Sequence, residues 1–342
     1  MKRWAKRIAI GIAALVGVAI LVGSVSEAII RARVVREYPV AGRLVDIGGG
    51  RRIQLDCRGS GAPTVILESG LDTYGSLSWA LVHDSIAATS RTCAYSRAGI
   101  MWTDAAAGAF DSKAVIEDLH DALTKAGEPA PFVIVGHSLG GPYALIYTGM
   151  YPAEVAGLVF VDASHPEQFP RLREATGNSM EAPTGMLSAV AALSWTGVMR
   201  LIPIGAPSNL PPAAVRAHHA FLSTSFGPAL RELKAISSTL EVAGEHRQLA
   251  DRPLVVLTAM APSPEAVLKS ARMTRDQDER RRVAWKALHD EEATWSTRSR
   301  HELVPDATHY IQFDRPDIVV RAVREVIGAV RNASVTDTTT SR

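Results

Sequence analysis

The chain has 342 residues, of which 47% are hydrophobic and 21% are charged. This composition is that of a folded globular protein, so it excludes a chain that is disordered throughout, and the length allows one large domain or two modest ones. The formal net charge is +2. Residues 1–37 hold seven of the 37 basic and two of the 35 acidic residues, so the remainder has 30 basic and 33 acidic residues, a net charge of −3. That balance excludes the basic surface that nucleic-acid binding requires.

The N-terminal segment has the pattern of a membrane anchor or a secretion signal. An apolar run from Ile8 to Gly23 follows four basic residues, Lys2, Arg3, Lys6 and Arg7. The run is slightly long for the core of a signal peptide and just short of an ideal membrane span. We expect residues 1–38 to form an apolar helix and linker that hold the chain in a membrane, with the following domain on the extracytoplasmic side. Cleavage near Ser26 or Ala28, which would release a secreted domain, is the alternative.

Short β-branched runs alternate with helical patterns in the rest of the chain. This alternation is typical of a mostly parallel sheet with helices on both faces. The expected strands are 43–47, 52–57, 64–67, 92–95, 132–135, 157–161, 254–257 and 301–304. The expected helices outside the long insertion described next are 76–88, 111–126, 139–150, 276–296 and 314–330, the last of them capped by Asp314. Gly48-Gly49-Gly50 joins the first two strands as a hairpin.

Almost ninety residues between Ser164 and Asp251 show no strand pattern. An insertion of this length between two strands is too long for a bare loop, and it holds helical stretches at 213–222 and 228–242. We therefore expect a helical lid over about 165–250, within a main domain that spans 39–331. The polar residues 332–342 are expected to form a disordered tail.

The most informative motif is Gly136-His137-Ser138-Leu139-Gly140, which stands between an expected strand and an expected helix. A serine on such a sharp strand-to-helix turn is held clear of the sheet at a helix N-terminus. Side chains at Gly136 and Gly140 would collide with neighbouring chain in so tight a turn. The pattern predicts that Ser138 is a nucleophile.

With this motif the sequence resembles the α/β-hydrolase family, in its lidded esterase and lipase-like branch, over roughly residues 43–330. Residues 65–71 look like the oxyanion loop after the third strand of that family, and residues 91–99 look like its fourth strand and following turn. The resemblance implies an eight-stranded, mostly parallel sheet that carries the lid. The chain departs from the family at Ser96, where an Asp is usual.

His309 follows the last expected strand and precedes the closing helix, where the family places its catalytic histidine. A serine hydroxyl is a weak nucleophile until an imidazole accepts its proton, and the chain order of serine before histidine fits. Two other histidines, His137 and His165, compete for this role. The resemblance favours His309, with Thr308 in place of the glycine that commonly precedes it.

The acid that would orient His309 is ambiguous in the sequence. The family usually supplies an Asp after the seventh strand, but residues 256–265 contain none. Asp162, at the end of the sixth strand, is the preferred candidate because some members use that place. Glu265 lies in the usual loop but several residues late, and a chain without an acid is the third alternative.

The resemblance also implies an oxyanion hole made by the backbone N–H groups of Leu71 and Leu139. Together these residues predict a serine hydrolase that cleaves a carboxylic ester, thioester or amide through an acyl-serine. An apolar lid favours a small-molecule substrate with an apolar acyl group. No cofactor or metal site is expected, because the sequence has no phosphate loop, dinucleotide fingerprint or zinc helix.

Two questions stay open at this stage. The first is whether the protein is instead a catalytically silent, membrane-tethered binding protein that retains the fold, since fold alone does not establish activity. The second concerns the only two cysteines, Cys57 and Cys93. The family's strand order makes their strands neighbours, so an exported domain would allow them to form a disulfide. The sequence does not indicate an oligomeric state.

Overall fold

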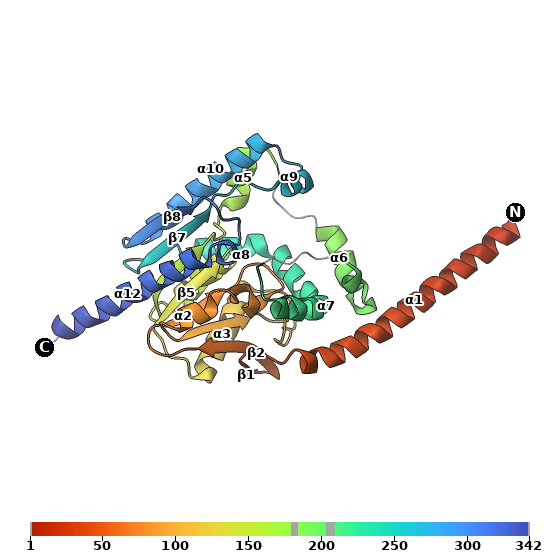
Figure 1. Cartoon of the computed structure of the whole chain (residues 1–342), viewed down its shortest axis with the longest axis horizontal. Coiled ribbons are helices and arrows are strands. Elements are labelled where there is room, and N and C mark those ends of the chain that lie inside the picture. Colours follow the sequence, from red (N-terminus) through yellow and green to blue (C-terminus); the bar gives the residue numbers. More distant parts are fainter. Residues whose placement is uncertain (1, 179–183, 203–208, 341–342) are drawn as a thin grey trace.

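The structure is a computed structural model that describes residues 2–178, 184–202 and 209–340. Its centre is a mixed, mostly parallel sheet of eight strands in the order β1-β2-β4-β3-β5-β6-β7-β8 (Figure 1). The strands are β1 (Arg43–Gly48), β2 (Arg51–Arg58), β3 (Thr64–Glu68), β4 (Thr92–Ser96), β5 (Phe132–His137), β6 (Val155–Val161), β7 (Leu254–Ala259) and β8 (Ser299–Val304). Only β2 runs antiparallel to its neighbours, β1 and β4. The sequence prediction of the fold is confirmed, with each expected strand present.

Helices cover both faces of the sheet, which is why the central strands are buried on both sides. Along β5, Phe132 and Ile134 pack into one apolar core, and Val133 and Val135 pack into the other. The first core contains α3 (Ser112–Ala126), α4 (Gly140–Met150) and α8 (Ile236–Gly244). The second contains α2 (His83–Ala87) and α12 (Pro316–Thr340). Successive side chains of one strand thus pack into two different cores, which is expected of a strand that lies between two layers of helices.

The insertion between β6 and β7 is helical. It contains α5 (Gln168–Thr176), α6 (Thr184–Ala192), the 3-10 helices η2 (Ser194–Thr196) and η3 (Val198–Leu201), α7 (Pro212–Lys234) and α8. Helix α5 packs on α10 (Arg275–Glu292), and α8 packs on α4, so both belong to the layers around the sheet. The remaining elements, α6, η2, η3 and α7, lie beyond the sheet, and we name them the cap.

Helix α7 corrects one prediction, since it is a single helix where two stretches with a break were expected. Pro228 lies inside it. Steric conflict with a proline arises partly from the Cβ of the preceding residue, and residue 227 is a glycine, which has none. The proline ring also packs against Gly99, where an added Cβ would lie 2.5 Å from its Cγ. The sequence pattern indicates a helix end at Pro228. In the folded chain the helix continues through this proline, which packs against Gly99.

Two further boundaries differ from the prediction. The expected helix 76–88 is divided into the 3-10 helix η1 (Gly75–Trp79) and the short α2. Contacts at its start hold the tighter turn, because Ser96 Oγ accepts from the N–H of Ser76 and Asp72 accepts from the Ser78 hydroxyl. At the C-terminus, α12 continues to Thr340, ten residues beyond the expected end of the closing helix at 330. No glycine or proline stands between 332 and 340 to end it.

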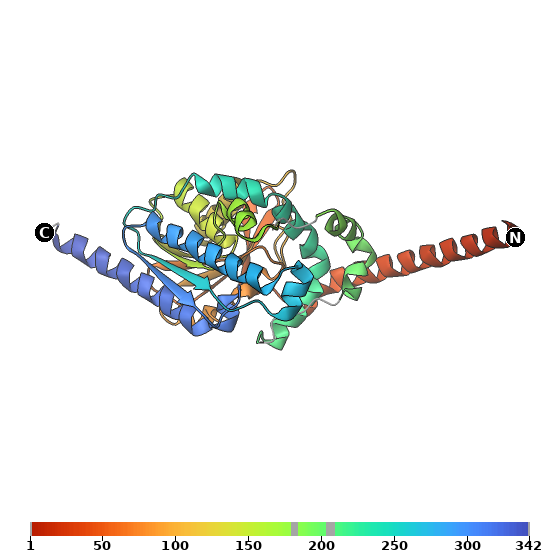
Figure 2. The same cartoon turned by 90° about the horizontal axis from the view of Figure 1, so that it is seen from above.

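Helix α1 (Lys2–Glu37) leaves the domain at one end of the molecule, opposite the end reached by α12 (Figures 1 and 2). Its apolar N-terminal part is exposed, whereas its C-terminal part contacts η2 and α7. Cys57 and Cys93 stand opposite each other in β2 and β4 and are joined by a disulfide.

Candidate active site

Ser138 stands at the turn between β5 and α4, at the carboxyl end of the central strands. Its φ is +52°, in the left-handed region that costs an ordinary side chain conformational energy. The flanking glycines make this turn sterically feasible. A Cβ at Gly136 would lie 2.5 Å from the carbonyl oxygen of Gly140, and one at Gly140 would lie 2.3 Å from that of Glu68. The backbone therefore requires glycine at both positions, as the motif predicted.

His309 reaches this turn from the loop between β8 and α11 (Ile311–Asp314). Its Nε2 lies 2.9 Å from Ser138 Oγ, which is hydrogen-bond distance. Asp314 holds the loop, because its carboxylate accepts hydrogen bonds from the backbone N–H and the hydroxyl of Thr308. This contact corrects the expectation that Asp314 caps the closing helix, since Asp314 is the last residue of α11 and its carboxylate binds Thr308.

Asp162 lies directly after β6 and completes a chain of hydrogen bonds. Its Oδ2 is 2.6 Å from Nδ1 of His309, and its Oδ1 accepts from the backbone N–H of Ala259 and the indole N–H of Trp285. The residue is 3% exposed. Burial alone would raise the pKa of Asp162, but its hydrogen bond to His309 and the nearby imidazoles lower it below the usual value. The carboxylate is therefore held ionised against the ring of His309.

Glu265 lies elsewhere. It begins α9 (Glu265–Ala271), its side chain is 81% exposed, and it forms an ion pair of 2.6 Å with Arg275. Both ring nitrogens of His309 already have partners in Ser138 and Asp162. The structure thus brings Asp162, and not Glu265, to the histidine.

The two competing histidines take other positions. The Nε2–H of His137 donates to the backbone carbonyl of His309 at 2.9 Å, and its Nδ1 has no hydrogen-bond partner among the described residues. Burial lowers the pKa of His137 to about 3, so its ring is neutral. His165 is buried beside Trp295, and its Nδ1 accepts from the N–H of Glu167. His137 supports the loop of His309, and His165 belongs to a separate cluster.

The backbone N–H groups of Leu71 and Leu139 flank the serine. Leu139 follows Ser138 at the N-terminus of α4, and Leu71 lies in the loop after β3. The loop touches the turn closely, since a Cβ at Gly70 would lie 3.0 Å from the Cβ of Ser138. Within the part of the chain that the structure describes, neither N–H donates a hydrogen bond. Two main-chain donors are therefore free beside Ser138.

Residues 38–322 match the family model described as the Alpha/beta hydrolase family. This chain belongs to that family. A curated relative, an uncharacterised protein of Schizosaccharomyces pombe, is 35% identical over 74 residues, which are 22% of this chain and 14% of that protein. The matched stretches cover between 14% and 39% of the lengths of the curated relatives of this α/β hydrolase.

Solved structures share the fold of this α/β hydrolase. An esterase from Thermogutta terrifontis has a TM-score of 0.53 and 18% identity, with 84% of this chain and 98% of that chain covered. The enol-lactonase from Burkholderia xenovorans LB400 has a TM-score of 0.57 and 16% identity, with 83% and 99% covered. At these identities the likeness concerns the fold alone.

The α/β hydrolase also has a buried charge cluster under the loop of Leu71, which the sequence analysis missed. Arg97 donates to the carbonyl oxygens of Ser69 and Gly70, at 2.7 and 2.6 Å, and forms ion pairs with Glu68 and Glu232. Its guanidinium thus fixes the two peptide units before Leu71 and ties them to α7 of the cap. A signal for this residue was the single arginine in the turn after β4, but its partners lie 29 and 135 positions away.

Proposed function

We propose that this α/β hydrolase is a serine hydrolase in which Ser138 is the nucleophile, His309 the general base and Asp162 the orienting acid. The observation that carries the proposal is the continuous hydrogen-bonded chain from Ser138 Oγ through His309 to Asp162. These three groups come from three separate loops at the carboxyl ends of strands, where open α/β sheets place their ligands. The substrate class is a carboxylic ester, with thioester or amide as the alternatives.

In the first half of the reaction, Ser138 Oγ attacks the carbonyl carbon of the substrate while its proton passes to Nε2 of His309. The negative charge that develops on the carbonyl oxygen is met by the N–H groups of Leu71 and Leu139. Removing one such donor typically costs about 3 kcal/mol of transition-state stabilisation. The carbon–oxygen bond to the leaving alcohol then breaks, and His309 returns the proton to that alcohol, which leaves an acyl-serine.

In the second half, water replaces the alcohol. His309 accepts a proton from the water, the resulting hydroxide attacks the acyl-serine, and the acid is released as the proton returns to Ser138 Oγ. Asp162 keeps Nδ1 protonated and Nε2 free to accept, and it stabilises the imidazolium that forms in each half. The lowered pKa of Asp162 supports this role, because an ionised carboxylate is needed throughout.

The surroundings of His309 support a substrate with an apolar acyl group. Tyr310, the next residue, packs with Phe313 and with Leu210 and Val215 of the cap region in one apolar cluster. An acyl chain placed at Ser138 would meet this cluster. Initial rates on chromogenic esters of increasing acyl length test the proposal, which expects a preference for chains longer than acetyl.

We also propose that α1 anchors the enzyme in a membrane and that the catalytic domain lies on the extracytoplasmic side. Residues 3–37 form a helix whose most apolar window of 18 residues has a mean hydropathy of 2.6 and no buried residue. Basic residues precede the apolar run, and the Cys57–Cys93 disulfide suits an oxidising compartment. Cleavage after Ala28 would remove Glu27, whose buried contacts with the cap are described below. The mass of the mature N-terminus separates retention from secretion.

Labelling with a fluorophosphonate probe tests the catalytic proposal. Wild-type enzyme should be labelled, and Ser138→Ala and His309→Ala should lose the label while remaining folded. Ser270→Ala, an exposed serine on α9, is the matched control and should label like the wild type. A folded wild-type protein that takes no label would instead favour the catalytically silent binding protein.

A further inference from the structure

Large apolar side chains are exposed in one part of the cap. Outside α1, eight such residues are exposed within the described chain, and three of them, Val267, Val283 and Leu303, are scattered singly. The other five are Met186, Leu193, Trp195, Leu201 and Ile202. We name these five the apolar cap patch. Leu201 is 83% exposed and Trp195 is 51% exposed. A cluster of this kind on a surface, unlike single residues, marks a contact with a partner.

The patch adjoins the apolar helix. The backbones of α1 and η2 touch, since a Cβ at Gly23 would lie 2.3 Å from the carbonyl oxygen of Thr196. Arg31 of α1 also donates to the carbonyl oxygen of Ser194 at 3.2 Å. Figure 2 shows α6 and the short helices after it beside the C-terminal half of α1. Trp195, between these two contact residues of η2, therefore lies at the C-terminal end of the apolar run of α1.

A buried ion cluster fixes this arrangement. Glu27 of α1 is 1% exposed, and its carboxylate accepts from the guanidinium groups of Arg31 and Arg200 and from the hydroxyl of Ser223. Arg200 lies in η3 and Ser223 in α7, so two cap elements are joined to α1. Removing one partner of a buried ion pair is strongly destabilising. The cap and α1 are thus held together as one unit.

The length of α1 places this junction at a membrane surface. A hydrocarbon core of about 30 Å requires about 20 helical residues, which from Ile8 reaches Glu27. Gly23, where η2 touches α1, is four residues before that point, or about 6 Å along the helix axis. Trp195 then lies at the depth where tryptophan side chains gather at membrane interfaces.

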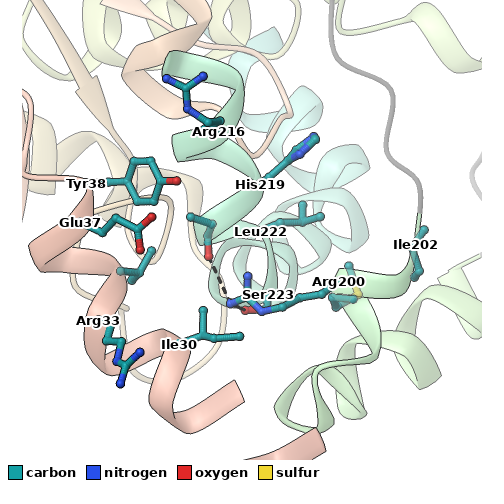
Figure 3. A pocket seen from close by; sticks show the side chains of 13 residues that line it. Ile30, Arg33, Glu37, Tyr38, Arg200, Ile202, Arg216, His219, Leu222 and Ser223 are labelled. Carbon is teal, nitrogen blue, oxygen red and sulfur yellow. Dashed lines mark hydrogen bonds between the residues drawn. The ribbon is translucent and has the colours of Figure 1, made fainter. Parts of the chain in front are cut away.

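Cationic groups lie further along α1, beyond the level of Glu27. A cavity of about 780 Å³ separates the C-terminal part of α1 from α7, and Figure 3 shows Arg33, Arg216 and His219 in its wall. The one carboxylate in that wall is Glu37. Within the described residues, Arg33 and Arg216 form no ion pair. Arg33 is six residues beyond Glu27, or about 9 Å, which is the depth of lipid headgroups. Guanidinium groups there suit phosphates.

From these observations we infer that the apolar cap patch inserts into the interfacial layer of the same phospholipid bilayer that holds α1. The inference rests on the proposed anchoring by α1. Apolar side chains of the patch contact the acyl boundary, and the guanidinium groups behind them contact headgroup phosphates. Helix α7 packs on α6 and is linked through Glu232 and Arg97 to the loop of Leu71, so the cap that contacts the bilayer is connected to the proposed oxyanion loop.

Fluorescent probes on the full-length enzyme in phosphatidylcholine–phosphatidylglycerol vesicles test the inference. Cys57 and Cys93 are bonded, so one introduced thiol can be labelled selectively. Leu201→Cys reports on the patch, and Ile12→Cys reports on the membrane span. Val283→Cys, exposed on α10 outside the cap, is the matched control. Each is labelled with an environment-sensitive dye, and quenching by brominated lipids is measured.

The inference predicts a blue-shifted emission at position 201 and about twofold or more the lipid quenching found at position 283. Equal, water-like emission and quenching at positions 201 and 283 overturn it, whether or not position 12 is quenched. A quenched position 12 together with a water-like position 201 refutes the patch contact and leaves the anchor intact. If position 12 is not quenched, the anchoring proposal fails separately, and stronger quenching at 201 than at 283 would still support contact of the patch with lipid.

Discussion

The indole N–H of Trp285 donates a hydrogen bond of 2.9 Å to Oδ1 of Asp162. Both residues are buried, and 123 positions separate them in the sequence. The bond leaves Oδ2 of Asp162 to face His309, so the indole sets which oxygen orients the imidazole. Trp285 is therefore a positioning residue for the proposed reaction.

We predict that Trp285→Phe lowers kcat about tenfold and changes KM little. A hydrogen bond to a charged group contributes about 1.5–3 kcal/mol, and phenylalanine removes it while keeping an aromatic ring at the position. Steady-state kinetics on a soluble ester measure the effect. Trp295→Phe, another tryptophan whose ring lies beside His165, is the control. Equal kcat in the wild type and Trp285→Phe would show that the indole only fills space.

The two candidate acids give a second prediction. Asp162→Asn should lower kcat by about four orders of magnitude, because an amide cannot hold His309 in the tautomer that accepts the serine proton. Glu265→Gln should leave kcat unchanged, since Glu265 is exposed and paired with Arg275. Circular dichroism shows whether each variant is folded. A large loss in Glu265→Gln with little loss in Asp162→Asn would reverse the assignment.

The positions of Ser138 and His309 in the fold were predictable from the sequence because their signals are local. The glycines around Ser138 are required by steric contacts within a few residues of the turn, and His309 occupies a short loop between a clear strand and a clear helix. The strands were equally predictable, because β-branched runs buried on both faces have a strong pattern. The order of the strands in the sheet was predicted only from the resemblance to the α/β-hydrolase family.

The remaining parts depend on distant contacts. The choice between Asp162 and Glu265 depends on which loop reaches Nδ1 of His309, and no local pattern reports that distance. Trp285 stands on a mostly polar helix, where its contact to Asp162 has no periodic signature. In the sequence, Glu27 only interrupts an apolar run. In the structure it pairs with Arg200, 173 positions away, and so joins α1 to the cap. Pairings of this kind become visible only in the folded chain.

Arg97 gives a third prediction, through the loop that carries Leu71. Arg97→Lys keeps the charge between Glu68 and Glu232, but an ammonium group cannot reproduce the forked contacts to the carbonyl oxygens of Ser69 and Gly70. We expect kcat to fall by about ten- to a hundredfold with KM little changed, because the loss of one oxyanion donor costs about 3 kcal/mol and a displaced donor costs less.

Arg97→Met provides the contrast, since it leaves two carboxylates without their cation. It should lower the free energy of unfolding by about 3–5 kcal/mol, as measured by urea titration. If Arg97→Lys lost stability to the same extent but kept its kcat, the cluster would serve the fold and not the loop.

Asp278 gives a prediction on pH dependence. Burial raises the pKa of Asp278, but hydrogen bonds from Ser263 and from Arg281 outweigh it and lower the pKa to about 2. The carboxyl of an unfolded chain has a pKa of about 3.9, so the folded state favours the ionised form. Its contribution to stability is complete above about pH 4 and is lost as the pH falls toward 2. A difference of this size between the pKa values of Asp278 in the folded and unfolded states corresponds to about 2–3 kcal/mol of folding stability.

Asp278→Asn should therefore lower the free energy of unfolding by about 2 kcal/mol at pH 7, and the difference from wild type should shrink between pH 4 and pH 2. Urea titrations at pH 7, 4 and 2.5 measure it. Asp276→Asn, an exposed neighbour in the first turn of α10, is the control and should change little. A difference that is constant with pH would contradict the assigned pKa.

The central claim is that the hydroxyl at Ser138 forms a covalent bond with the acyl group during turnover. Mass spectrometry of peptides from enzyme quenched during turnover of a slowly hydrolysed ester tests it most directly. We predict one acyl group on the peptide that contains Ser138, and none in His309→Ala. An unmodified Ser138 peptide in an enzyme that still hydrolyses the ester, or an acyl group on another residue, would contradict it.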